Sequence, residues 1–440
     1  MKYRCFIWLL LISIFINAQN SFEIKDAKKT VVPFKLINNL IFIPVNINGA
    51  DLTFLLDTGV AETSIFSLEN KEVKLTTLEK IKFSGLGGNA SIDGFRSDNN
   101  TGTIGKNFIN KSLSLFIIVN QEFNISSHVG IPVNGIIGYH FFKDHAVSID
   151  YISKKITIYN DIELLRKKTK RFEEFPISIE KNKPYIEAEV EMTNEKKTSK
   201  LLIDLGNSDP IWLFPTLIKN FVYNRPNIDD FLGRGFNGDV YGKRSRIHNF
   251  YLGDFKFEKP LTAMPDEFSI QHVNLVENRR GSVGGEILRR FTIIFDYPDQ
   301  KIYLKKNKNY DDPFHFNMSG LDFQQDGLSW EKDFVALETG AKKASNEIEV
   351  INNNLQYKFV LKPLFSIAGV RKDSPADRAG LKKDDRIITI NGRKTLDMTL
   401  EYIMELMKSE EGKTITMLIK RKDQELTLSF TLEDPIPYQE

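Results

Sequence analysis

Alternating hydrophobic and polar positions, typical of half-buried strands, dominate the chain from residue 35 to residue 308. Turn dipeptides such as Asn48-Gly49 separate the apolar segments. The long amphipathic helices that a parallel sheet would require do not follow these segments. We therefore predict a mainly β fold. In the first half of this region, the expected strands are rich in Ile, Val, Phe and Thr and cover residues 42–48, 52–56, 113–119 and 155–159.

The same region contains an internal repeat. Five landmarks in its first half recur in its second half at offsets of 146 to 148 residues, which chance does not explain. The repeat predicts two β lobes, residues 35–160 and 172–308, with a charged linker over residues 160–174. The landmark pairs are Asp57-Thr58-Gly59 with Asp204-Leu205-Gly206, Gly85 and Gly87 with Gly233 and Gly235, Gly105 with Gly253, Gly138 with Gly284, and Asp150-Tyr151 with Asp296-Tyr297.

Two Asp-x-Gly turns stand at matching points of the repeat, each directly after an apolar strand. A single Asp-Thr-Gly is most simply a turn, because Asp and Gly are preferred in turns. A pseudo-twofold axis between the lobes, however, would bring Asp57 and Asp204 face to face. Two carboxylates that close together cannot both ionise, so the pair would share one proton. One carboxyl could then act as a base on water and the other as an acid.

With these motifs, residues 35 to 308 resemble an aspartic protease of the retropepsin and pepsin type, with both halves in one polypeptide. The family pattern continues with two apolar residues and a glycine, found here as Ile136-Ile137-Gly138 and, with Ser282 in the first position, as Val283-Gly284. The resemblance implies an endopeptidase that uses water as the nucleophile and needs no metal or cofactor. It implies catalytic roles for Asp57 and Asp204, supporting roles for Thr58, Gly59, Gly206, Asn207 and Ser208, and flap positions for Gly85, Gly87, Gly233 and Gly235.

One position departs from the family pattern. The family has a hydroxyl residue after each catalytic aspartate, and Thr58 keeps it, whereas Leu205 does not. Two alternatives follow. Bracing by Thr58 is enough, with help from Asn207 or Ser208, or the second site is weakened and the protein only binds peptides.

The pattern changes after Pro313. Ser374-Pro375-Ala376 opens a short helix, residues 387–390 form a strand before Asn391-Gly392, and apolar residues then recur at helical spacing from Leu400 to Met407. Residues 314–434 resemble an α+β PDZ domain of the bacterial protease-associated kind. The resemblance implies binding of peptide C-termini, and it places Ser319, Gly320, Leu321 and Phe323 in the peptide-binding loop and strand. About thirty mostly polar residues, 324–355, are expected to separate that loop from the next strand.

Composition and charge narrow the function further. The chain has 440 residues, a formal net charge of +2, one cysteine and six scattered histidines. The balanced charge argues against nucleic-acid binding. The single cysteine excludes an intramolecular disulfide, and no histidine pair has metal-ligand spacing, so no metal site is expected.

The first residues read as a targeting segment. Lys2 and Arg4 precede an apolar run over residues 6–16, and small and polar residues follow, which predicts a signal peptide over residues 1–18. The apolar run is too short to span a bilayer. We expect an exported protein, periplasmic or secreted, with no membrane span after signal removal.

These features together predict two duplicated aspartic-protease-like β lobes followed by an α+β PDZ domain. The functional hypothesis is an exported aspartic endopeptidase that acts on polypeptides, with a PDZ domain that binds peptides or regulates access. The alternatives are a catalytically weak or inactive, protease-like scaffold that binds peptides and a purely structural envelope protein. Because both copies lie in one chain, a monomer suffices.

Overall fold

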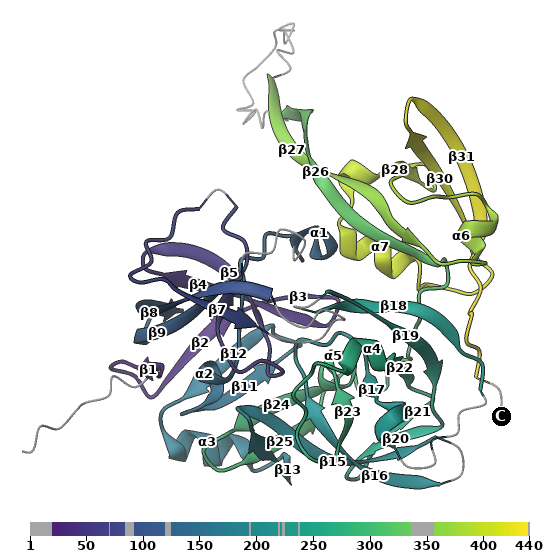
Figure 1. Ribbon diagram of the computed structural model, residues 1–440. Helices are drawn as coiled ribbons and strands as arrows, with labels where there is room; N and C mark the ends of the chain where they lie inside the picture. Colours follow the sequence, from purple (N-terminus) through teal and green to yellow (C-terminus); the bar gives the residue numbers. More distant parts are fainter. Residues whose placement is uncertain are drawn as a thin grey trace, which may run out of the picture.

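The computed structural model describes residues 20–69, 71–83, 92–118, 125–192, 195–218, 221, 225–235, 238–335 and 356–438. The predicted signal peptide lies outside these residues. Figure 1 shows two β-rich lobes side by side and a smaller C-terminal domain above them. The prediction of a mainly β fold with two lobes and a C-terminal α+β domain is confirmed. No helix in the described ranges is both long enough and apolar enough to cross a membrane.

Lobe 1 is built on a sheet whose central strands are mostly apolar and buried. The hairpin of β4 (Leu40–Ile47) and β5 (Ala50–Leu56) forms its centre, with antiparallel pairs such as Ile43 with Phe54. β5 also pairs in parallel with β10, so the strand that ends at Leu56 is bordered on both sides. The other strands are β1 (Glu23–Ile24), β3 (Lys35–Ile37), β6 (Ser64–Ile65), β7 (Glu79–Phe83), β8 (Ile92–Ile104), β9 (Phe108–Ile118) and β10 (Gly135–Ile137).

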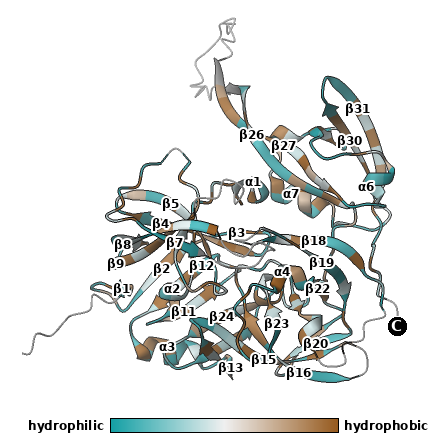
Figure 2. Cartoon of the chain, viewed as in Figure 1, coloured by the Kyte–Doolittle hydropathy of each residue, from teal (hydrophilic) through white to brown (hydrophobic). Residues whose placement is uncertain are grey.

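Lobe 2 repeats this arrangement. β15 (Lys183–Glu191) and β16 (Lys196–Ile203) form the corresponding hairpin, and β16 pairs in parallel with β23 (Arg279–Val283) as β5 does with β10. Figure 2 shows hydrophobic and hydrophilic positions alternating along the strands. The remaining strands are β14 (Ser178–Glu180), β17 (Ile211–Leu213), β18 (Ile228–Gly235), β19 (Gly238–Arg246), β20 (Asn249–Leu252), β21 (Phe255–Glu258) and β22 (Leu261–Pro265).

A shared sheet joins the lobes. β11 (Ala146–Asp150) from lobe 1 pairs antiparallel with β24 (Phe291–Asp296) from lobe 2, and Ile149 lies opposite Ile293. Both residues are fully buried in one hydrophobic core that extends through both lobes. The sheet is completed by β2 (Lys29–Pro33), β12 (Lys155–Tyr159), β13 (Glu173–Pro176) and β25 (Lys301–Lys306).

Short helices connect these strands. The predicted linker contains α3 (Ile162–Thr169), which begins where the Asp161 side chain accepts from the main-chain N–H groups of Glu163 and Leu164. The others in the two lobes are α1 (Ser126–Val129), α2 (Tyr139–Phe142), α4 (Glu267–Ile270) and α5 (Gly285–Leu288). α2 and α5 follow β10 and β23 at corresponding places of the repeat.

The C-terminal domain has a hydrophobic core of its own, which includes Leu321, Phe323, Ile403 and Met407. The polar spacer expected over residues 324–355 was wrong at its start, because β26 continues through it to Val335. The cross-strand partners in β27 stabilise this polar segment as a long hairpin. The elements are β26 (Leu321–Val335), β27 (Gln356–Val370), α6 (Pro375–Arg378), β28 (Arg386–Ile390), β29 (Arg393–Lys394), α7 (Leu400–Leu406), β30 (Thr414–Arg421) and β31 (Gln424–Thr431).

After β31 the chain returns to lobe 2. Ile436 is buried in a small cluster with Leu261 of lobe 2 and with Phe316, which lies in the segment before β26. Arg246 of β19 donates to the main-chain carbonyls of Ile436 (3.1 Å) and Phe314 (3.1 Å). The C-terminal domain is therefore attached to lobe 2 at both its beginning and its end.

The shared sheet makes a prediction about stability. Replacing Ile293 with Ala removes buried methyl groups at the junction of the lobes and should lower the free energy of unfolding by about 2–5 kcal/mol. Thr292→Ala, on the same strand but half-buried, should lower it by less than about 1 kcal/mol. Urea unfolding measures both values. Equal effects of the two substitutions would contradict a junction stabilised by core packing.

Candidate functional site

Asp57 and Asp204 occupy equivalent places at the seam between the lobes. Asp57 directly follows β5, and its N–H donates to Ile137 of β10 (3.0 Å). Asp204 directly follows β16, and its N–H donates to Val283 of β23 (2.9 Å). In each lobe, parallel pairing with the neighbouring strand therefore fixes the position from which the carboxyl group projects.

The two carboxyl groups hydrogen-bond to each other. The turns are narrow because each carboxyl also accepts from the glycine two residues further on: Gly59 N–H donates to Asp57 (2.6 Å) and Gly206 N–H to Asp204 (3.1 Å). A β-carbon on Gly59 would lie 2.8 Å from Asp204 Oδ1, and one on Gly206 would lie 2.2 Å from Asp57 Oδ2. Glycine is required at both positions for the carboxyl groups to meet.

Thr58 joins the lobes through its hydroxyl group. The hydroxyl donates to the main-chain carbonyl of Ile203 (2.6 Å) and accepts from the N–H of Leu205 (3.0 Å). Thr58 is 1% exposed, so both bonds are shielded from water. The Leu205 side chain is instead buried in the hydrophobic core. Thr58 of lobe 1 thus hydrogen-bonds to the main chain on both sides of Asp204 in lobe 2.

Asn207 and Ser208 lie beside the second turn and stabilise its surroundings. The Asn207 side chain donates to the Ser282 hydroxyl (3.4 Å) and accepts from the N–H of Asp209 (3.0 Å). Ser208 uses its main-chain carbonyl, which accepts from Asn39 of lobe 1 (3.0 Å). These bonds hold the loop after Asp204 and connect it across the seam.

Burial dominates the electrostatics of the pair. Burial, reinforced by the charge of Asp204, raises the pKa of Asp57 to about 8. Burial also raises the pKa of Asp204, although the charges of Arg279 and Lys183 oppose the shift. At neutral pH the pair therefore retains a proton and can both donate and accept a hydrogen bond.

The flap positions fall in two different places. Gly85 and Gly87 lie outside the described residues. Gly233 and Gly235 lie near the end of β18, which forms a long hairpin with β19. Within this hairpin Arg234 pairs with Asp239 at 2.7 Å.

The residues expected to bind peptide in the C-terminal domain lie together at the start of β26. Ser319 Oγ accepts from the N–H of Leu321 (3.0 Å), and Gly320 adopts a left-handed conformation (φ 78°). A β-carbon on Gly320 would lie 2.2 Å from that of Ser374. Leu321 and Phe323 are buried in the domain core. The loop is therefore tightly fitted against the turn before α6.

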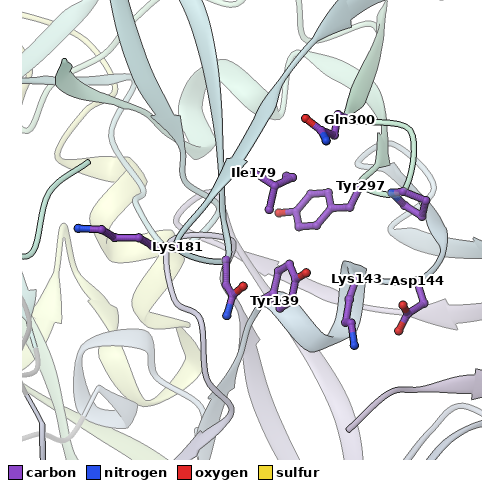
Figure 3. A pocket seen from close by; sticks show the side chains of 9 residues that line it. Tyr139, Lys143, Asp144, Ile179, Lys181, Tyr297 and Gln300 are labelled. Carbon is purple, nitrogen blue, oxygen red and sulfur yellow. The ribbon is translucent and has the colours of Figure 1, made fainter. Parts of the chain in front are cut away.

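A cavity of about 570 Å³ lies elsewhere between the lobes. Its lining includes Tyr139 at the start of α2, Tyr297 directly after β24, and the turn at Lys181, and Figure 3 shows the two tyrosines facing it. Neither Asp57 nor Asp204 lines it. In the described part of the chain, no group of three or more His, Cys, Asp or Glu side chains could hold a metal ion.

Comparison with known families identifies the C-terminal domain. Residues 366–421 match the model of the PDZ domain family. The matched segment runs from within β27 to the end of β30, and the loop and β26 precede it. The match covers the turn into α6, strand β28 and helix α7, which are the elements that the sequence motifs indicated.

The curated relatives are named as proteases. A "Probable CtpA-like serine protease" of Staphylococcus haemolyticus is 34% identical over 59 residues, which are 13% of this chain and 12% of that protein. The "Carboxy-terminal processing protease CtpB" of Bacillus subtilis is 36% identical over 62 residues, 14% of this chain and 13% of that protein. A CtpA-like relative from Staphylococcus epidermidis is 24% identical over 118 residues, 27% of this chain and 21% of that protein.

Among solved structures, the aspartic proteinase of Irpex lacteus matches with a TM-score of 0.41 and 12% identity, covering 64% of this chain and 99% of that one. The curated relatives, by contrast, correct the functional prediction. The sequence motifs predict an aspartic, retropepsin-like endopeptidase, whereas these relatives are named as serine and carboxy-terminal processing proteases. The aspartic classification is therefore contradicted, while the PDZ domain is shown.

Sequence reasoning missed several charged and polar groups around the aspartates. Lys183 and Arg279 act on Asp204, and Tyr185 interacts with Arg279. Arg279 also lies with its guanidinium carbon 5.1 Å from the centre of the Phe214 ring. No local motif marks these residues, since each belongs to an ordinary strand pattern and only the fold brings them to the seam.

The Thr58 bonds predict a large effect of a small substitution. Thr58→Val keeps the shape but leaves the Ile203 carbonyl and the Leu205 N–H buried without a partner, which should lower the free energy of unfolding by about 1–3 kcal/mol for each group. Thr58→Ser keeps the hydroxyl and should lose about 1 kcal/mol or less. Urea unfolding distinguishes them, and a Ser variant as unstable as the Val variant would refute the role of the hydroxyl.

The raised pKa of Asp57 makes stability depend on pH. A carboxyl with a raised pKa binds its proton more tightly in the folded protein, so its contribution is complete below its ordinary pKa near 4 and is lost as the pH rises through about 8. The wild-type protein should lose more stability than Asp57→Asn between about pH 5 and about pH 8.

The control for this measurement is Asp423→Asn, on the exposed turn between β30 and β31. Its urea midpoints should follow those of the wild type across the same pH range. If Asp57→Asn also follows the wild type, the folded protein does not hold the proton at this pair.

Proposed function

We propose that this chain is an exported polypeptide-binding protein whose PDZ domain holds an extended peptide along β26. The observation that carries this proposal is the edge of β26: within the described strands it pairs with β27 on one side only. PDZ domains bind peptides by adding them as a strand to such an edge. The protease names of the relatives support a protein that handles polypeptides.

Helix α7 supplies the second wall of the groove. α7 lies alongside β26 in Figure 1, and the two elements are in contact. Leu400, Ile403 and Met407 of this region belong to the same apolar core as Leu321 and Phe323. These core contacts hold α7 in place, so the proposed groove has the main-chain hydrogen-bonding groups of β26 on one wall and α7 on the other.

A buried arginine lies beside the loop at the end of the groove, close to Asp230 and Asp322. Arg371 N–H donates to the Gly320 carbonyl (2.8 Å), which fixes this arginine beside the loop. Its Nη2 atom is buried without a hydrogen-bond partner, and Asp230 Oδ1 lies 4.0 Å from its Nη1. We propose that the free carboxylate of a peptide is attracted by this guanidinium group.

The Asp57–Asp204 pair is proposed as a second contact point for the same polypeptide. A pair of carboxyl groups that shares one proton can donate to a main-chain carbonyl and accept from a main-chain N–H. The charges of Lys183 and Arg279 stabilise its ionised state. This role is limited to binding.

Gly320 provides the test of the PDZ groove. The probes are short fluorescent peptides with an apolar last residue and a free carboxylate, and the same peptides with amidated C-termini. The wild-type chain should bind the free-carboxylate set more tightly. Gly320→Ala should weaken that binding at least about tenfold, since the new methyl group would collide with Ser374 and displace the loop.

Gly392→Ala is the matched control. Gly392 also has a positive φ (76°) in the same domain, but a β-carbon on it would meet no atom within 4 Å. Both variants therefore carry similar backbone strain, and only Gly320→Ala disturbs the loop. Fluorescence anisotropy measures the affinities. Equal binding of free and amidated peptides, or equal loss in both variants, would contradict the proposal.

A further inference from the structure

The short segment of residues 126–130 in lobe 1 lies against the PDZ domain. Figure 1 shows α1 beside α7, and α1 contacts both β26 and α7. Val129 anchors the segment in lobe 1, where it is buried in a cluster with Val133 and Phe42. Gly130 ends the helix in a left-handed conformation (φ 78°), and its N–H donates to Ser126 (2.8 Å).

His128 contacts the wall of the groove. Its imidazole hydrogen-bonds to the main chain of Phe323 in β26. The acceptor is the carbonyl, because this bond favours the charged form of the imidazole. A main-chain carbonyl of the edge strand is a group that an added peptide strand would bind with its own N–H. His128 therefore takes a position that a bound peptide would use.

Gly130 lies between the two walls. A β-carbon on it would lie 3.0 Å from Leu400 Cβ at the start of α7 and 3.7 Å from Gln325 Oε1 in β26. A neighbouring turn of lobe 1 adds a contact to α7, where the Asn38 side-chain amide lies 3.3 Å from Met404 Sδ. A glycine this close to both walls leaves no room there for a peptide.

We propose that residues 126–130 occupy the PDZ groove of their own chain and that a polypeptide must displace them in order to bind. This inference rests on the proposed peptide-binding function and adds its regulation. The ligand remains a polypeptide with a free C-terminus. The competitor is the α1 segment, so binding of the peptide separates the groove from lobe 1.

The extent to which the segment weakens peptide binding depends on the fraction of molecules whose groove is empty. If only a fraction of molecules has an empty groove, the apparent dissociation constant is the intrinsic constant divided by that fraction. A segment that fills the groove in about nine molecules of ten weakens binding about tenfold.

The attachment of the PDZ domain to lobe 2 does not oppose this displacement. Ile436 and the Arg246 bonds hold the domain at lobe 2. The α1 contact, by contrast, belongs to lobe 1. The segment that must leave the groove therefore belongs to lobe 1 and not to the attachment at Ile436 and Arg246.

Gly130→Leu tests the inference in the full chain. The side chain would collide with Leu400 and expel the segment, so the affinity for the free-carboxylate fluorescent peptides should rise about tenfold. Gly49→Leu is the matched control, because Gly49 also has a positive φ (94°) but a β-carbon on it would meet no atom within 4 Å. His128→Ala, which removes the bond to Phe323, should raise the affinity as well.

The outcomes separate the two proposals. Tighter binding by Gly130→Leu and His128→Ala, with Gly49→Leu unchanged from the wild type, supports the competition. Equal dissociation constants for all four proteins would overturn it and leave the peptide-binding function standing. If none of the four proteins binds the peptides, the proposed function itself is overturned, and the competition with it.

Hydrogen exchange of the wild-type chain gives an independent readout. Peptide addition should raise the exchange rate of the Gly130 amide, because α1 then loses the cover of Leu400 and Gln325 and its closing bond to Ser126 opens more readily. An unchanged rate at a saturating peptide concentration would mean that the peptide binds without moving the segment, contrary to the inference.

Discussion

The structure depends on holding two carboxyl groups together in a buried seam. Two ionised carboxylates would repel each other there, and a shared proton removes that repulsion. Around the pair, the surrounding chain is closely constrained: glycines at 59 and 206 leave room for the oxygens, and the Thr58 hydroxyl ties the two turns together. The shared sheet of β11 and β24 then fixes the distance between the lobes. The relative position of the two lobes is thus set by the contacts at the seam.

Much of the fold, above all the two equivalent lobes, could be predicted from the repeat in the sequence. Landmarks at a constant offset are visible without a structure, and they correspond to β5 with β16 and β10 with β23. The pairing of β11 with β24 could not be predicted, since the alternation of a strand does not specify its partner across a lobe boundary. The extent of β26 could not be predicted either, because its polar residues, such as Gln324 and Gln325, are stabilised by cross-strand partners rather than by burial.

The chemistry of the site was less predictable than its location. Asp57 and Asp204 could be found from two short motifs, whereas Lys183 and Arg279 reach the pair only through the folding of lobe 2. Leu205 lacks the hydroxyl of the family pattern, but Thr58 bonds to the main chain on both sides of the turn, where side-chain identity does not matter. The aspartic classification came from motif resemblance and is contradicted by the serine-protease relatives. Motifs located the residues but did not establish the enzyme class.

The return of the chain to lobe 2 after β31 has a mechanical consequence. With Phe314 and Ile436 both bonded to Arg246, the two ends of the PDZ domain are anchored close together on one lobe. Two neighbouring attachment points define an axis. They allow the PDZ domain to rotate about this axis more easily than to move away from lobe 2. In such a rotation, the end of the domain far from lobe 2, with the long β26–β27 hairpin, would be displaced the most.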